Sequence, residues 1–242
     1  PSAQQIPAIS YEETLEMAAN GAKILHLRCV EYARRNNMPI HVRSSFSEKH
    51  GTWVVAAEDV NSYFEEGQAM EQAIISGVAH DRSEAKITIV GVPDKVGNAA
   101  AILRALGDAL INIDMIVQNV SAAATGVTDI SFTLPGSDGQ TAMTALARLK
   151  DSVGFEQLLY NDAVGKVSIV GAGMRSAPGI TAKFFEALAA VGINIDMIST
   201  SEIRISVVVA ENQVDAAVNA AHDAFDLGSD EVEAVVYGGT GR

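Results

Sequence analysis

The sequence predicts an α+β protein in which two tandem βαββαβ units follow a short α/β segment. The first observation is a hexapeptide, Ile-Asn-Ile-Asp-Met-Ile, which fills residues 111–116 and again 193–198. The second is a shared lead-in to each copy. It consists of a strand-like run that begins at Lys86 or Lys166, a glycine-bearing turn and a helix-periodic segment. Because an internal repeat decides the architecture before any local signal, this duplication sets the number and order of the predicted units.

Composition restricts the class of protein and the kinds of partner. The 242 residues, 48% of them apolar, suffice for two or three small domains. A net charge of −13 argues against nucleic acid or an anionic membrane surface as partners. With Cys29 as the single cysteine, no internal disulfide can form, so a cytoplasmic location is expected. No apolar run approaches the ~20 residues of a membrane span. The first residues lack a signal-peptide pattern and an initiator Met, so we expect a processed chain or a fragment.

The N-terminal segment predicts two helices and a strand. Ser10 and Glu13 have the spacing of a capping box, which starts a helix at 11–19. An apolar stripe predicts a second helix at 22–36, and residues 39–46 have the composition of a strand. Such a piece belongs to an α/β layer but is too short to close one. We therefore expect the segment that covers it to be missing from this chain.

Each repeat has the element order of a ferredoxin-like domain. A polar connector at 47–72 and a short strand at 74–79 precede the first repeat. Within the repeats, helical periodicity alternates with β-branched runs, which gives an antiparallel sheet with both helices on one face. The predicted elements are 85–92, 96–109, 112–120, 126–134, 138–152 and 155–161 in the first copy, and 165–172, 178–191, 194–201, 203–210, 212–225 and 232–237 in the second.

The turn between the first strand and first helix of copy one is the leading candidate for ligand chemistry. A helix N-terminus offers free amides to a carboxylate, and Asp94 offers the opposite sign to an ammonium group, so the turn suits a free amino acid. The alternative is that Asp94 only caps the helix and Gly97 only permits the turn. The corresponding turn of copy two, residues 171–179, contains no acid, so the two turns are not equivalent.

The hexapeptides place polar residues at the start of a strand. Asn112 and Asn194 stand where an amide can contact a ligand or close a turn, while Asp114 and Asp196 alternate with apolar residues. These acids belong either to a solvated strand face or to an interface or pocket. No phosphate-binding glycine motif occurs, and the five His residues lack metal-ligand spacing, so no metal site is predicted.

These motifs resemble a known family. The tandem units, the Asp-Lys-x-Gly turn at 94–97 and the Asn-Ile-Asp-Met-Ile segments are similar to the paired ACT domains of aspartate kinase. The runs 118–121 and 199–206 are specific to that family among ACT proteins. Residues 9–25 and 42–46 resemble the last part of its kinase domain, which has the α/β amino-acid-kinase fold. The resemblance implies a kinase-domain remnant at 1–50, a linker at 51–72, and ACT domains at 73–164 and 165–242.

The resemblance implies a regulatory role for this chain. Aspartate kinase converts ATP and L-aspartate to 4-phospho-L-aspartate, the first step of lysine, threonine and methionine biosynthesis, with ATP and Mg²⁺ in the complete enzyme. The family's Lys-Phe-Gly-Gly-Thr-Ser phosphate loop is absent, and Lys23 is the only match to a nucleotide-site residue. We therefore expect no catalytic residue, no cofactor and no activity in this chain alone. Some family members are α2β2 enzymes whose β subunit starts internally, and Met70 lies where such a start would fall.

The resemblance also implies L-threonine and L-lysine as effectors. A homodimer formed through the ACT domains, with a catalytic α subunit as a further partner, would bind them for feedback inhibition. Val96 stands where the family usually has Pro, which loosens the turn without removing a contact group. The alternative is a stand-alone amino-acid-binding dimerisation module with no link to catalysis. The implied effector residues are Asp94, Lys95, Gly97, Asn98, Ala99, Asn112, Ile113, Asp114 and Gln118, completed by Asn194 and Ile195 from the other subunit, with Thr181, Ser201 and Glu202 near a lysine-type effector.

Overall fold

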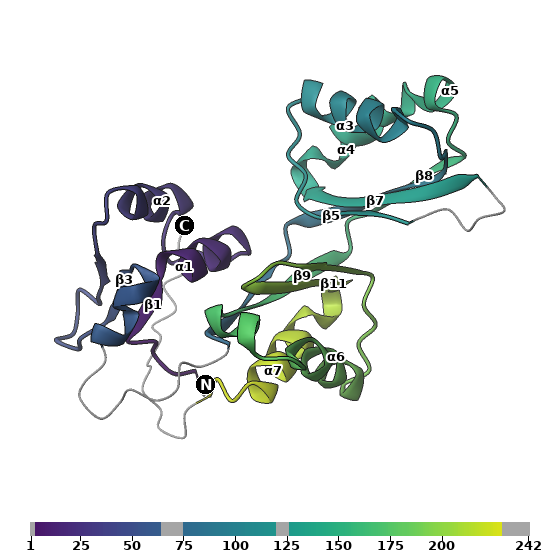
Figure 1. Cartoon of the computed structure of the whole chain (residues 1–242). Coiled ribbons are helices and arrows are strands. Elements are labelled where there is room, and N and C mark those ends of the chain that lie inside the picture. The colour runs from purple at the N-terminus through teal and green to yellow at the C-terminus, as the bar shows by residue number, and fades with distance from the viewer. Residues whose placement is uncertain (1–2, 64–74, 120–125, 229–242) are drawn as a thin grey trace. The chain divides into compact units, whose positions relative to one another are not determined.

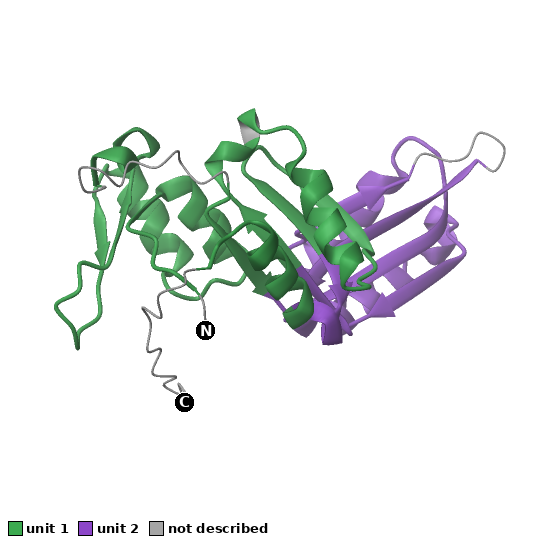
Figure 2. Ribbon diagram, turned by 90° about the horizontal axis from the view of Figure 1, so that it is seen from below, with its two compact units in different colours: residues 1–80, 167–207, 215–242 green, residues 81–166, 208–214 purple. Residues whose placement is uncertain are grey.

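The computed structural model describes residues 3–63, 75–119 and 126–228 (Figure 1). Its contacts divide the chain into two compact units, which are coloured in Figure 2. Unit 1 comprises Pro1–His80, Val167–Val207 and Asp215–Arg242, and unit 2 comprises Asp81–Lys166 and Val208–Val214. Each unit contains more than one chain segment, so the fold is not a simple series of consecutive domains.

The N-terminal segment forms a small three-stranded sheet with two helices. The strand order is β1-β3-β2, with β1 parallel and β2 antiparallel to the central β3. The capping box is present as predicted, because Glu13 N donates to Ser10 Oγ and the Glu13 carboxylate accepts from Ser10 N. The elements are β1 Ala8–Ser10, α1 Tyr11–Ala19, α2 Leu27–Arg35, β2 Ile40–Val42, β3 Thr52–Val55 and η1 Ala57–Tyr63.

Several features of this segment differ from the prediction. The strand predicted at 39–46 is confined to β2, and β1 was not predicted. The helix predicted at 22–36 begins only at Leu27, because Gly21 adopts a φ of 103° that opens a turn and His26 caps the helix. The segment predicted as a connector and linker contains β3, the central strand of the sheet. Its partner in the parallel pairing, Ala8, lies far away in sequence, so no local signal marks this strand as central.

The first repeat forms the predicted ferredoxin-like unit. Its sheet has the order β6-β7-β5-β8, with all pairings antiparallel, and α3 and α4 cover one face of it (Figure 1). Ile87, Ile89 and Phe132 of the sheet pack with Leu106 and Leu146 of the helices in one apolar core. The elements are β5 Glu84–Pro93, α3 Asn98–Asp108, β6 Ile116–Gln118, β7 Val127–Pro135, η2 Gly136–Asp138, α4 Gly139–Ala147, α5 Lys150–Val153 and β8 Gln157–Asn161.

The second repeat builds its sheet with a strand from before the first repeat. The order is β10-β11-β9-β4, so β4 occupies the edge beside β9. The structure thus assigns β4 to the second sheet, although the predicted range 73–164 placed it in the first ACT domain. The strand predicted at 232–237 lies outside the described residues. The elements are β4 Gly77–Asp81, β9 Val164–Val170, η3 Ala172–Ser176, α6 Ile180–Ala190, β10 Met197–Thr200, β11 Arg204–Ala210, η4 Glu211–Gln213 and α7 Val214–Ala224.

The hexapeptides are mainly connections and only partly strand. Strands were predicted at 112–120 and 194–201, but β6 begins at Ile116 and β10 at Met197. In the first copy Ile111 and Met115 are buried while Asn112 is exposed, so the segment anchors itself by alternate apolar side chains. Among the described residues, no helix combines the length and apolar character needed to cross a bilayer.

Candidate functional site

The first turn presents an uncapped helix N-terminus. The strand β5 ends at Pro93, and the N-cap of α3 is Gly97, whose φ of 101° favours glycine. No side chain caps α3, so the alternative in which Asp94 only caps the helix is not what the structure has. Asp94 is exposed, and a backbone hydrogen bond fixes its position, because Asp94 N donates to Gly126 O at 2.9 Å. Asn98 Nδ2 closes the turn by donating to Pro93 O at 2.8 Å.

Gln118 lies at the same end of the sheet as this turn. It is the last residue of β6 and pairs with Ile130 of β7. Next to it, Asn119 N donates to Asp129 O, and the Asp129 carboxylate accepts from Gly91 N at 2.9 Å. The structure therefore brings the turn of the first repeat and the end of β6 to one edge. The predicted residues at this edge are Asp94, Lys95, Gly97, Asn98, Ala99 and Gln118.

The hexapeptide of the first repeat lies at the opposite end of the sheet. Asp114 N donates to Thr133 O, whereas Asp94 N donates to Gly126 O. Seven residue steps of an extended strand separate those two acceptors, which corresponds to about 23 Å. Asn112, Ile113 and Asp114 therefore cannot reach a ligand held by Asp94 of the same unit.

Asp114 instead pairs with a buried lysine. Lys166 is 2% exposed, and its Nζ donates to Glu84 Oε1 at 2.7 Å and also to Asp114 Oδ2. Burial alone would lower the pKa of Lys166, but the hydrogen bonds and charges of Asp114 and Glu84 outweigh it and raise that pKa. The carboxylate of Asp114 is therefore already paired with Lys166, although the side chain itself is 39% exposed. In the sequence Lys166 is recognisable only as the start of a repeat, since its partners lie 52 and 82 residues away.

The second turn has the same helix start without an acid. The N-cap of α6 is Gly179, with a φ of 96° and no side-chain cap. Gly171 N donates to Ile203 O, and Ser201 N donates to Arg204 O, so the end of β9 and the β10–β11 connection lie together. Thr181, Ser201 and Glu202 are exposed at this end. Asn194 and Ile195 precede β10 and belong to its opposite end.

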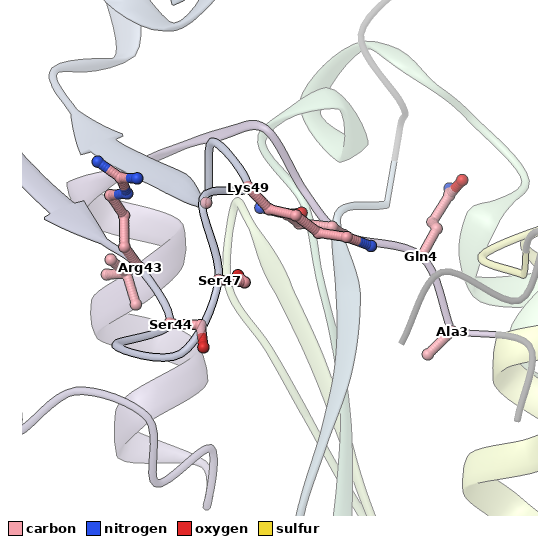
Figure 3. A pocket seen from close by; sticks show the side chains of 9 residues that line it. Ala3, Gln4, Arg43, Ser44, Ser47 and Lys49 are labelled. Atoms are coloured by element: carbon pink, nitrogen blue, oxygen red, sulfur yellow. The ribbon is translucent and has the colours of Figure 1, made fainter. Parts of the chain in front are cut away.

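The predicted nucleotide-site residue is not brought together with the other predicted residues. Lys23 is exposed in the turn between α1 and α2. A separate hollow of about 420 Å³ lies on the N-terminal segment, where Lys49 extends towards Gln4 and Arg43 points away (Figure 3). Lys23 does not line this hollow. In the described part of the chain, no group of three or more His, Cys, Asp or Glu side chains is placed to hold a metal ion.

We predict that Lys166→Met destabilises the protein by about 3–5 kcal/mol, because Glu84 is left as an unpaired buried charge. The pKa of Lys166 is higher in the folded than in the unfolded protein, so the charged lysine stabilises the fold by the full amount below its ordinary pKa of about 10.4. This stabilisation is lost as the pH rises through the raised pKa. The stability gap between wild type and variant should therefore be full below about pH 10 and shrink as the pH rises above it. Urea unfolding followed by circular dichroism measures this gap.

The double variant Lys166→Met with Glu84→Gln serves as the control for this experiment. Removing the second charge should restore part of the lost stability, since the carboxylate no longer lies unpaired in the core. A pH-independent gap, or a double variant as unstable as the sum of both changes, would show that the cluster does not act through charge.

Sequence comparisons agree with this architecture. A family model described as "ACT domain" matches residues 87–149 and 167–225, and one described as "Amino acid kinase family" matches residues 1–44. The protein called "Aspartokinase" from Mycolicibacterium smegmatis is 58% identical over 243 residues, which cover all of this chain and 56% of that protein. The chain thus spans about half the length of the curated relatives it matches.

Solved structures give the same result. The crystal structure of aspartokinase alpha and beta subunits contains a chain that is 46% identical, with a TM-score of 0.59, and the match covers 63% of this chain and 99% of that one. The regulatory subunit of aspartate kinase from Thermus thermophilus matches over the same fractions, at 39% identity and a TM-score of 0.59. The chain therefore belongs to the aspartokinase family, with a fragment of the amino acid kinase family followed by two ACT regulatory units.

Proposed function

We propose that this chain senses free amino acids for the feedback inhibition of an aspartate kinase. The observation that carries the proposal is the uncapped N-terminus of α3, with the exposed carboxylate of Asp94 beside it. Helix amides and a carboxylate at this spacing complement the carboxylate and ammonium groups of an α-amino acid. The relatives that match over the ACT region include a protein named as a regulatory subunit.

L-Threonine is the proposed ligand of the first turn and L-lysine that of the second. The first turn offers Asp94 and the amide of Gln118 at the same sheet edge, which suits a small polar amino acid. The second turn lacks an acid, but Glu202 lies at its end of the sheet and suits the ammonium group of a longer side chain. The two ends therefore favour different effectors.

A homodimer completes the first site. Within one unit, the turn and the hexapeptide lie at opposite ends of the sheet, so Asn112 and Ile113 cannot join Asp94. A two-fold pairing of antiparallel sheets brings the hexapeptide end of one unit to the turn end of another. Asn194 and Ile195 from a second copy of the chain would then contact an amino acid bound at the Asp94 turn. Binding across subunits would favour one subunit arrangement, which is the basis of allostery.

The phosphoryl transfer belongs to the complete enzyme in this proposal. Conversion of L-aspartate to 4-phospho-L-aspartate needs ATP, Mg²⁺ and phosphate-binding groups. No metal ligands are assigned to this chain, and a catalytic α subunit or a longer kinase domain in the cytoplasm would supply these parts. We expect the isolated chain to form no acyl phosphate from ATP and aspartate in a hydroxamate assay, and product above the ATP-only blank would contradict this.

We predict that Asp94→Ala weakens L-threonine binding about 10- to 150-fold, because a charge-assisted hydrogen bond contributes about 1.5–3 kcal/mol. Isothermal titration calorimetry on the whole chain measures the change. Asp108→Ala is the matched control, since Asp108 is an exposed carboxylate at the other end of the same helix. No heat from L-threonine or L-lysine with the wild-type chain would refute the sensing function. Equal affinity of wild type and Asp94→Ala would leave only a dimerisation module.

A mixing experiment tests whether the site is shared between subunits. Asp94→Ala and Asn194→Ala should each abolish tight L-threonine binding when alone. After unfolding and refolding together in equal amounts, half of the dimers are mixed and each has one intact site, so about a quarter of the wild-type sites should return. A mixture that binds no better than its components would show that each site is built within one chain.

A further inference from the structure

The helix α1 is bonded to the sheet of the second repeat through one polar face. Glu13, Glu16 and Asn20 follow the spacing that places side chains on the same side of a helix. Glu13 is buried, and its Oε1 accepts from Ser76 Oγ at 2.5 Å and from Ala172 N at 2.9 Å. Its Oε2 accepts from Ser10 Oγ at 2.6 Å. One carboxylate thus bonds the start of α1 to the beginning of the second turn.

Two further contacts extend this junction along the sheet. Arg204 Nε lies 3.1 Å from Glu16 Oε2, and both side chains are largely covered. Ser168 Oγ donates to Asn20 Oδ1 at 3.2 Å and also contacts Ser206 Oγ at 2.7 Å, and all three side chains are buried. A buried polar group that loses its hydrogen-bond partner destabilises the fold by about 1–3 kcal/mol. These contacts therefore hold α1 in one specific position on the sheet.

The junction holds the two strand ends that carry the second candidate site. Ala172 is the first residue of η3, within the 171–179 turn that leads to α6, and Arg204 follows Glu202 by two residues. Those strand ends are also bonded to each other, since Gly171 N donates to Ile203 O. Glu13 therefore bonds the segment that follows β9, and Glu16 pairs with the first residue of β11.

We propose that Glu13 and Glu16 are positioning residues of the second effector end, and that they couple amino-acid binding there to the N-terminal kinase-domain segment. This inference rests on the proposed function and concerns which contacts transmit the signal. Binding that moves the 171–179 turn changes the bonds of Glu13, and Glu13 also caps α1 through Ser10, the last residue of β1. By linkage, docking of α1 must in turn alter the affinity of that end for its ligand.

The chain carries its own reporter of the N-terminal segment. Trp53 is the single tryptophan, it lies in β3, and its ring stacks on that of His41 with centroids 3.8 Å apart. Its neighbour in the parallel pairing is Ala8 of β1, the strand that ends at the capping residue of α1. A displacement of α1 should therefore change the fluorescence of Trp53.

The experiment pairs calorimetry with Trp53 fluorescence on the whole chain, titrated with L-lysine and with L-threonine. We expect L-lysine to change the emission of the wild type. In the double variant Glu13→Gln with Glu16→Gln, heat of binding should remain, its affinity should shift by a factor on the order of 5 or more, and the emission change should be lost. Glu12→Gln is the matched control, because Glu12 pairs with Arg34 inside the N-terminal segment and should leave the response intact.

The outcomes separate the coupling from the proposed function. If the wild type gives heat of binding with either amino acid but its Trp53 emission does not change, the coupling alone is overturned. The coupling alone is also overturned if the double variant keeps the full emission change. Absence of heat for both amino acids overturns the sensing function and the coupling with it. If the double variant loses helical circular dichroism, Ser76→Ala replaces it, since that change removes a partner of Glu13 and leaves the capping box in place. A full response in Ser76→Ala with unchanged affinity also overturns the coupling.

Discussion

The antiparallel pairing of β5, β7 and β6 determines which residues of this protein can act together. Because β5 and β6 both run against β7, the turn after β5 and the end of β6 meet at one edge, and the hexapeptide before β6 starts from the other. A continuous strand of this length separates its ends by more than any side chain can span. The same pairing in the second repeat places Asn194 far from its own turn. This geometry is compatible with the proposed site shared between two copies, because it keeps the hexapeptide and the turn of one repeat from forming a single self-contained site.

The edge position of β4 links the regulatory part to the segment before it. In the sequence, β4 comes before the first repeat, but it pairs with β9 in the sheet of the second repeat. The first repeat is therefore inserted between two strands of the second sheet. The chain that leads into β4 then passes the end of β9, where Ser76 N donates to Val170 O at 2.7 Å. At Gly77 the chain passes close to α1, and a Cβ there would lie 2.8 Å from Cε of the flexible Met17 side chain. The sheet of the second repeat is thus the one bonded to the kinase-domain segment.

Local signals were sufficient for most of the fold. The capping box of Ser10, the helical periodicity of α3 and α6 and the βαββαβ order were all predicted, because each depends on residues close in sequence. The central place of β3, the pairing of β4 with β9 and the Lys166 cluster were not predicted, because the long-range partners that define them lie at least 45 residues away. For the candidate site, the residues of the turn are predicted from their chemistry and from the family resemblance, and they stay a prediction. Their division between two ends of a sheet needed the register, which no single repeat unit reveals.

The duplication conserves backbone conformation more strictly than side-chain chemistry. Both turns have a left-handed glycine at the helix N-cap, and the residue before each hexapeptide is also left-handed, with φ values of 58° for Leu110 and 71° for Gly192. A leucine tolerates that conformation only at a cost of about 1–2 kcal/mol, so the repeat imposes its geometry on a residue that disfavours it. Side chains were free to diverge on this common backbone. The first turn carries its own acid, Asp94, whereas the second receives the carboxylate of Glu13 from another element. The duplicated scaffold thus presents one turn with an exposed acid and one turn bonded to the N-terminal segment.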